Sequence, residues 1–139
     1  MNRDEFIGML DKKGYSYKVE GDKIIVNDKR DISFPFRTTI PSGVVFMNGG
    51  YVDLTSVNTM YPGVEFRNEG DVILRSLRAI PYDVVLSNNG DIDLRELTMI
   101  PSRLRFNNTG NVLLKWKFDI EGIRSKEILN TMIKRKIII

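Results

Sequence analysis

The sequence repeats every 20 residues over about 80 positions, without an insertion. Eight columns of equivalent residues recur in register across the units, and three of these columns are invariant. The invariant columns are Asn48, Asn68, Asn88 and Asn108, then Gly50, Gly70, Gly90 and Gly110, and then Leu54, Leu74, Leu94 and Leu114. An apolar column follows at Val52, Val72, Ile92 and Val112. Because one short unit cannot bury its own apolar face, this repeat predicts a fold built by stacking equivalent units.

Each unit contains two pairs of apolar residues spaced by two, for example Val64 with Phe66 and Val72 with Leu74. This alternation is typical of strands, so we expect two short strands in each unit. The Asn-x-Gly between the pairs predicts one bend, where Gly would supply a positive φ. The prolines that follow each unit's last apolar column predict the other bend. Stacked about 4.8 Å apart, the columns give a mainly β fold, a parallel β-solenoid of about five coils.

The organisation predicted is a single domain over residues 1–139, with a helical cap at each end to cover the exposed strand edges. Residues 1–19 would form the first cap, a helix from Asp4 to Lys13 that ends at Gly14, followed by a lead-in. Residues 20–40 form a degenerate first coil, in which Asp28 and Arg30 replace the Asn and the Gly.

The rest of the chain divides in the same way. Residues 41–120 contain the four regular repeats. Residues 121–139 would form the second cap and a tail, with a helix over Lys126–Lys136 that begins after Ser125.

The phrase Leu-x-x-Ile-Pro-x-x-Leu-x-Phe, from Leu97 to Phe106, resembles leucine-rich repeats, particularly the 20-residue bacterial kind. The whole chain is also similar to small repeat proteins common among uncharacterised genes of tailed bacteriophages. The resemblance implies recognition of a protein by an exposed sheet face, and a phage-encoded protein that acts on a host factor. The sequence departs from the leucine-rich pattern because its Asn and Gly precede the Val-x-Leu pair. A leucine-rich-repeat-like horseshoe with one sheet is therefore the alternative to the solenoid.

The sequence contains no cysteine and no histidine. This excludes a disulfide framework, a thiolate nucleophile, a Cys/His zinc site and a histidine general base. Asp53 and Asp93 are candidates for a carboxylate pair, about 9.6 Å apart from the strand spacing. Nothing in the sequence indicates the cleft or apolar pocket that would raise one of their pKa values. We expect a protein that is not an enzyme and that needs no cofactor or metal.

The invariant columns are interpreted as structural. Stacked Asn amides at a bend are expected to hydrogen-bond to one another and to satisfy nearby backbone groups. The Gly column lies in no motif that would cradle a phosphate.

The outward positions are more informative, because the repeat does not dictate them. One outward column contains Thr55, Arg75, Arg95 and Lys115, with Arg78 close in sequence. Stacked cations repel one another unless an anion meets them. Asp53 and Asp93 lie in the neighbouring column. Two interpretations stay open: a solvated surface that neutralises itself, or a binding site for a protein partner with an acidic surface.

The tail carries a basic triplet followed by three isoleucines: Lys134, Arg135, Lys136, Ile137, Ile138 and Ile139. The triplet suggests nucleic-acid binding, although basic residues also commonly end helices. The isoleucines are expected to pack on the last coil or to join a second subunit, because exposing them is unfavourable.

A run of about 18 apolar residues, which a membrane span requires, does not occur, and the first residues lack the basic character of a signal peptide. We therefore expect a cytoplasmic protein, in the host cytoplasm if a phage encodes it, without a membrane partner. The first hypothesis for function is a protein-binding repeat module. The alternatives are a nucleic-acid-associated protein that uses the basic C-terminal segment, and a self-assembling structural protein.

Overall fold

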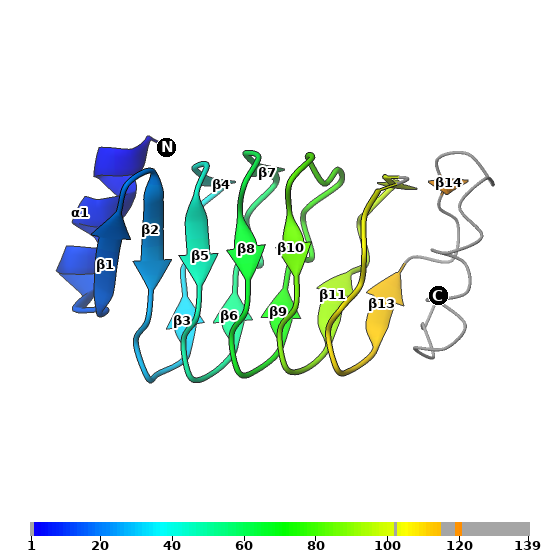
Figure 1. Cartoon of the computed structure of the whole chain (residues 1–139). Helices are drawn as coiled ribbons and strands as arrows, with labels where there is room; N and C mark the ends of the chain where they lie inside the picture. The colour runs from blue at the N-terminus through cyan, green and yellow to red at the C-terminus, as the bar shows by residue number, and fades with distance from the viewer. Residues whose placement is uncertain (1, 102, 115–118, 121–139) are drawn as a thin grey trace.

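The computed structural model describes residues 2–101, 103–114 and 119–120. It is a parallel β-solenoid of about four turns, preceded by one helix (Figure 1). Equivalent residues of successive turns pair 20 positions apart, as Ile24 does with Val44. The solenoid and its repeat length are as the sequence predicts.

The first sheet runs along one side of the solenoid and has five strands. They are β1 (Tyr17–Glu20), β2 (Lys23–Val26), β5 (Val44–Phe46), β8 (Glu65–Phe66) and β10 (Val85–Leu86). Strands β2, β5, β8 and β10 are parallel, and a bridge from Leu86 to Phe106 extends the sheet into the next turn.

The second sheet faces the first across the core and is parallel throughout. Its strands, in spatial order, are β3 (Ile32–Ser33), β6 (Val52–Asp53), β9 (Val72–Ile73), β11 (Ile92–Leu94) and β13 (Val112–Leu114). With strands on two opposing sides, the single-sheet horseshoe is wrong.

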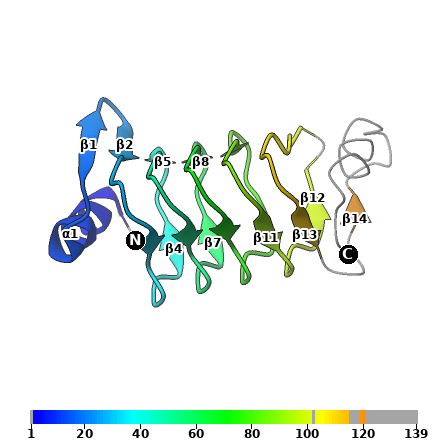
Figure 2. The same ribbon diagram turned by 90° about the horizontal axis from the view of Figure 1, so that it is seen from below.

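A third side carries short strands that the sequence pattern does not predict. They are β4 (Thr39–Ile40) paired with β7 (Thr59–Met60), and β12 (Met99–Ile100) paired with β14 (Asp119–Ile120). Figure 1 shows β4 and β7 away from β3 and β6 of the second sheet, and Figure 2 shows β4 and β7 following one another along the solenoid. The pattern misses them because β4, β7 and β12 each have a single inward residue, which leaves no apolar alternation to detect.

The core is a set of continuous rows between the three sides. The row of Val52, Val72, Ile92 and Val112 is fully buried, and the strand registers place these residues next to one another. Phe46 and Phe66 stack with ring centroids 5.2 Å apart and planes 7° apart. Each turn therefore shelters the apolar side chains of its neighbours, which is the source of stability in a repeat fold.

The N-terminal end is covered by α1 (Arg3–Lys13) and by β1, which pairs antiparallel with β2. The side chain of Asn2 accepts a hydrogen bond from the Glu5 amide, and Gly14 ends the helix with a φ of 71°. The buried Phe6 lies edge-on to Phe34 of the first coil, with centroids 5.6 Å apart. The predicted N-terminal cap is therefore confirmed. The helix predicted over residues 126–136 and the tail lie outside the described residues.

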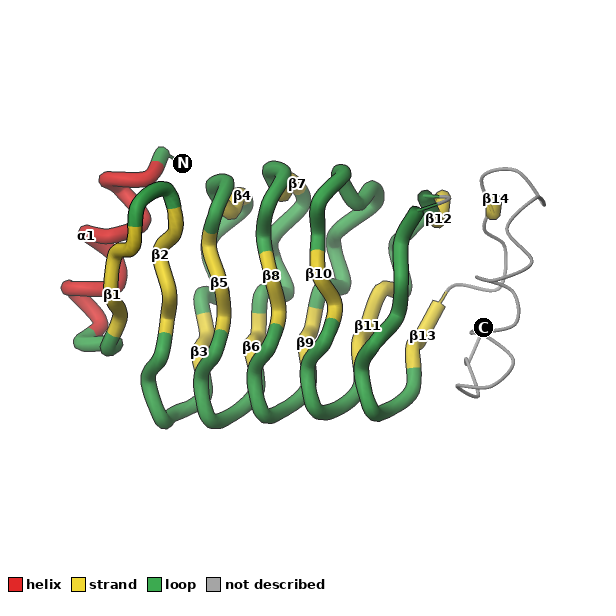
Figure 3. Tube along the Cα trace, in the orientation of Figure 1, coloured by secondary structure: helices red, strands yellow, loops and turns green. Residues whose placement is uncertain are grey.

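Three corners join the strands of each turn, and Figure 3 shows them as the loops between the strands. The asparagine corner follows the first sheet and contains residues 28–31, 48–51, 68–71, 88–91 and 108–111. The arginine corner follows the second sheet and contains residues 34–38, 54–58, 74–78 and 94–98. The proline corner precedes the first sheet and contains residues 41–43, 61–63 and 81–83.

The invariant glycines of the asparagine corner serve a different purpose from the one predicted. Positive φ occurs at the proline corner instead, at Gly43, Gly63 and Asp83. At Gly70 an added Cβ would lie 2.7 Å from the carbonyl carbon of Gly50. The column needs glycine because consecutive turns approach one another backbone to backbone at this corner.

Candidate functional site

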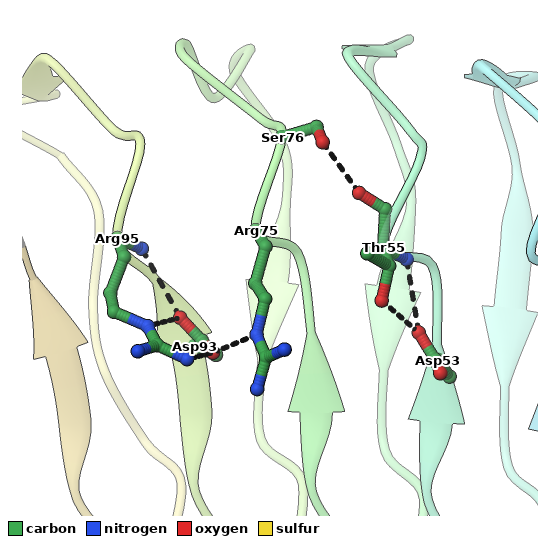
Figure 4. A network of polar contacts seen from close by, with 6 residues as sticks. All are labelled: Asp53, Thr55, Arg75, Ser76, Asp93 and Arg95. Atoms are coloured by element: carbon green, nitrogen blue, oxygen red, sulfur yellow. Dashed lines mark hydrogen bonds and ion pairs between the residues drawn. The ribbon is translucent and has the colours of Figure 1, made fainter.

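The arginine corner carries the candidate site. Asp93 lies in β11 with its neighbours Ile92 and Leu94 pointing into the core, so its own side chain points outward. Arg95 follows on the same turn and Arg75 lies on the preceding turn. Figure 4 shows both guanidinium groups directed at the one carboxylate.

The hydrogen bonds at this site are all centred on Asp93. Arg95 donates from Nε to Oδ1 at 2.9 Å and from Nη2 to Oδ2 at 2.8 Å. Arg75 donates from Nε to Oδ2 at 2.8 Å. The carboxylate is 9% exposed, whereas the side chains of Arg75 and Arg95 are 53% and 49% exposed. The pairing fixes the arginine side chains and leaves their outer edges in solvent.

The charges at this site do not cancel. Burial by itself would raise the pKa of Asp93, but the hydrogen bonds from Arg95 and Arg75 outweigh burial and hold that pKa below its ordinary value. The same contact with Asp93 raises the pKa of Arg95. One carboxylate thus faces two guanidinium groups, and the group of three keeps one net positive charge.

The earlier turn of the corner carries a carboxylate whose hydrogen bonds come from uncharged groups. The Asp53 carboxylate accepts hydrogen bonds from the backbone amide and the hydroxyl of Thr55 (Figure 4). The Ser76 hydroxyl donates to the Thr55 carbonyl at 2.6 Å, which ties the two turns together. Asp53 and Asp93 are not brought together, because β9 lies between their strands. A carboxylate clamped by two arginines is also the opposite of a general acid, which needs a raised pKa.

Arg78 lies on the same corner as Arg75. Arg78 is exposed, and it contributes only its backbone carbonyl, which accepts from the amide and hydroxyl of Thr98. Lys115 and the tail residues 134–139 lie outside the described residues. The structure therefore brings Arg75, Arg95 and Asp93 into one ion-pair group, and the described contacts of Arg78 on the same corner are those of its backbone carbonyl.

The asparagine column is structural, but its bonding differs from the prediction. Asn68 Nδ2 donates to the carbonyls of Gly50 at 3.0 Å and Gly70 at 3.1 Å. The amides therefore bond to backbone carbonyls and not to one another. Among the described residues, the Oδ1 atoms of Asn48, Asn68, Asn88 and Asn108 have no hydrogen-bond partner. The column joins each turn to the one before it.

The first turn explains why Asp28 replaces asparagine. Asp28 faces donors: the Ser16 amide at 2.8 Å and the Arg30 guanidinium at 2.9 Å. These bonds, foremost those of Arg30, hold the pKa of Asp28 far below its ordinary value. Arg30 also donates to the Gly14 carbonyl at 2.7 Å and lies over the Tyr15 ring. The degenerate coil is therefore adapted to the N-terminal cap.

The sequence pattern did not single out Phe36, the most exposed large apolar residue described, at 91%. It lies in the arginine corner of the first turn, beside the last turn of α1. The segment Phe34-Pro35-Phe36 could have indicated it, because the repeat requires only one of these two phenylalanines to face inward.

No protein-family model, curated protein or solved structure matches the chain. Within the ranges that the structure describes, no cluster of three or more carboxylates is placed to hold a metal ion. In the same ranges, no helix has the length and apolar character needed to cross a membrane. The function must therefore be inferred from the geometry of the arginine corner.

Proposed function

We propose that the protein is a non-enzymatic binding module that recognises an acidic protein surface through Arg75 and Arg95. The observation that carries the proposal is the unequal pairing at this corner, two guanidinium groups on one buried carboxylate. Asp93 occupies only Nε of Arg75, which leaves both terminal nitrogens of that residue for a partner's carboxylate.

Fixed arginines suit this role for two reasons. A guanidinium offers paired donors that match a carboxylate, and arginine is enriched at protein interfaces. A side chain that is already held in place loses less conformational entropy when a partner binds. The stacked turns supply the rigid support that such positioning requires.

The resemblance to bacterial 20-residue repeats and to small phage proteins supports the finer part of this proposal. This finer part is that a phage encodes the protein and that it acts on a host factor in the host cytoplasm. The nucleic-acid and self-assembly hypotheses depend on residues 134–139, which lie outside the described part of the chain, and they stay predictions.

The test is affinity capture from the source cells, with the immobilised full chain and quantitative mass spectrometry. The Arg75→Gln variant removes one guanidinium while Arg95 still pairs with Asp93. The matched control is Arg103→Gln, because Arg103 is exposed near the proline corner and the charge change is the same. We expect acidic proteins that are captured by the wild type and the control but lost with Arg75→Gln. Equal capture by all three would contradict the proposal.

A further inference from the structure

Phe36 and the hollow beside it form an apolar feature on the same corner as the arginine site. Its neighbour Phe34 is 1% exposed and packs under α1, while Phe36 projects into solvent at 91% exposure. An isolated exposed phenylalanine forfeits the free energy gained when such a side chain is buried. Here it borders a hollow of about 440 Å³ between the last turn of α1 and the loop from Phe34 to Arg37, with Met9 in its lining.

Three cations surround this hollow: Lys12, Lys13 and Arg37. The Lys13 ammonium donates to the Ser33 carbonyl at 2.9 Å, and Arg37 Nε donates to the Met9 sulfur at 2.8 Å. No carboxylate of the described ranges lies within 4.0 Å of the charged nitrogens of these three cations. The hollow is therefore apolar at its floor and positively charged at its rim.

The hollow lies on the same corner of the solenoid as Arg75 and Arg95. Ile32, Val52 and Val72 pair in register, so the loops that follow them stack in the same order. The Ser56 hydroxyl donates to the Pro35 carbonyl, just as Ser76 donates to Thr55 one turn later. With about 4.8 Å between strands, Pro35 lies about 10 Å along the solenoid axis from Arg75 and about 14 Å from Arg95, and Phe36 is the next residue in the chain.

We propose that these two features form one docking surface for a single acidic segment of the partner protein. This inference rests on the proposed function and specifies its ligand. An apolar side chain of the segment enters the hollow beside Phe36, and carboxylates further along the segment meet Arg75 and Arg95. An α-helix lying along the solenoid axis matches the spacing, since it rises about 10 Å in seven residues and about 15 Å in ten.

A protein segment fits this surface better than an anionic membrane does. Thr55 separates Arg37 from Arg75 along the corner, and Asp53 and Asp93 lie among the cations. A bilayer would place phosphates against these two acids as well, whereas a peptide can place its carboxylates opposite the arginines only. The charge pattern therefore favours a segment with separated acidic residues.

The experiment uses a fluorescein-labelled, alanine-rich helical peptide of about 15 residues as the probe, with leucine at position 3 and glutamate at positions 10 and 13. Two matched peptides replace either the leucine by serine or both glutamates by glutamine. Fluorescence anisotropy measures the binding of each to the full-length wild type and to the variants Phe36→Ser and Arg75→Gln. Tyr82→Ser is the control, because Tyr82 is 74% exposed at the proline corner.

We expect the parent peptide to bind, with affinity reduced about tenfold by Phe36→Ser or by either peptide replacement, and unchanged by Tyr82→Ser. Arg75→Gln should weaken the parent peptide and leave the glutamine peptide unaffected. Because Phe36 is exposed, the Phe36→Ser variant is expected to fold, which circular dichroism checks.

The outcomes separate the two proposals. Sensitivity to Arg75→Gln without sensitivity to Phe36→Ser overturns the shared surface and keeps the proposed function. Sensitivity to Phe36→Ser alone overturns both. No binding by the parent peptide overturns this inference, and capture from cells then decides the proposed function separately. The inference is also overturned if Phe36→Ser instead abolishes binding to phosphatidylserine vesicles or dissociates a dimer.

Discussion

The asparagine corner and the arginine corner lie at the two ends of the second-sheet strands and meet different physical demands. At the asparagine corner the asparagine side chains are buried, and Asn68 makes the same bonds that Asn108 makes two turns later. At the arginine corner the side chains are exposed, and each turn pairs differently: Thr55 with Asp53, but Arg75 and Arg95 with Asp93.

This difference separates stability from recognition. A buried side chain must satisfy the same backbone atoms on every turn, so one residue type fits every turn. An exposed side chain is free of that constraint, and its identity reflects what it meets outside. Changes at the asparagine corner should therefore affect unfolding, and changes at the arginine corner should affect binding.

The largest effect is expected for Gly70→Ala. The added Cβ would lie 2.7 Å from backbone atoms of Gly50 and Tyr51, so the two turns must separate. We expect a loss of about 3 kcal/mol in the free energy of unfolding, measured by urea titration. The control is Gly8→Ala on α1, where nothing lies within 4 Å of the new Cβ and a gain of up to about 1 kcal/mol is expected. Similar behaviour of the two variants would refute the close-approach explanation.

Asn68→Leu tests the bonds between turns. It keeps the approximate size of the side chain but leaves the carbonyls of Gly50 and Gly70 without their donor. A loss of about 2 kcal/mol is expected in the same titration. The exposed Asn107 supplies the control, since Asn107→Leu should stay within about 0.5 kcal/mol of the wild type. A small effect at Asn68 would mean that the column is dispensable for stability.

Asp28→Asn tests why the first turn carries a carboxylate, which only accepts hydrogen bonds, in place of an asparagine amide. An amide keeps one acceptor for Ser16 and Arg30 but turns a donor toward them, at a cost of about 1 to 2 kcal/mol at pH 7. Because the pKa of Asp28 is lowered in the folded state, its contribution is present above the unfolded pKa of about 4 and is lost as pH falls below it. Urea titrations from pH 7 to pH 2 should show a smaller fall in stability for the variant than for the wild type. Parallel curves for the two would contradict the assignment, and Asp22→Asn, at an exposed turn, provides the control.

The smallest effect on folding is expected for Arg75→Gln. Arg75 is half-exposed and Asp93 keeps its bidentate pair with Arg95, so the free energy of unfolding should change by less than about 0.5 kcal/mol. Arg75→Gln would then lose binding to the acidic partner protein while keeping the stability of the wild type. A loss above about 1 kcal/mol would place Arg75 with the structural residues and weaken the comparison between the corners.

Much of the fold was predictable because the positions that repeat as apolar residues are the positions that are buried. The row from Val52 to Val112, the cap helix ending at Gly14 and the pairing of the first coil all followed from apolar spacing and capping residues. The strands of the third side were missed, because one inward residue such as Met60 produces no alternation. The role of the Gly70 column was also misjudged, since the distance between turns is not encoded within one unit.

The candidate site was predictable only as a set of candidates. Sequence spacing placed Arg75 and Arg95 in one column and Asp93 beside it, and left open whether they neutralise one another. The structure shows that one carboxylate serves both arginines, and that Arg78 contacts Thr98 of the next turn through its backbone carbonyl. Phe36 was missed, because its exposure depends on how α1 covers the first coil, which is a contact between segments that the repeat does not contain.

The sequence by itself determined the stacking of 20-residue turns and the identity of the inner rows, because apolar burial requires the same residues at every turn. The tertiary structure alone decided which outward charges pair, why one corner needs glycine and where Phe36 lies. These depend on distances between neighbouring turns and between the cap and the first coil, and such distances exist only once the chain has been wound into the solenoid.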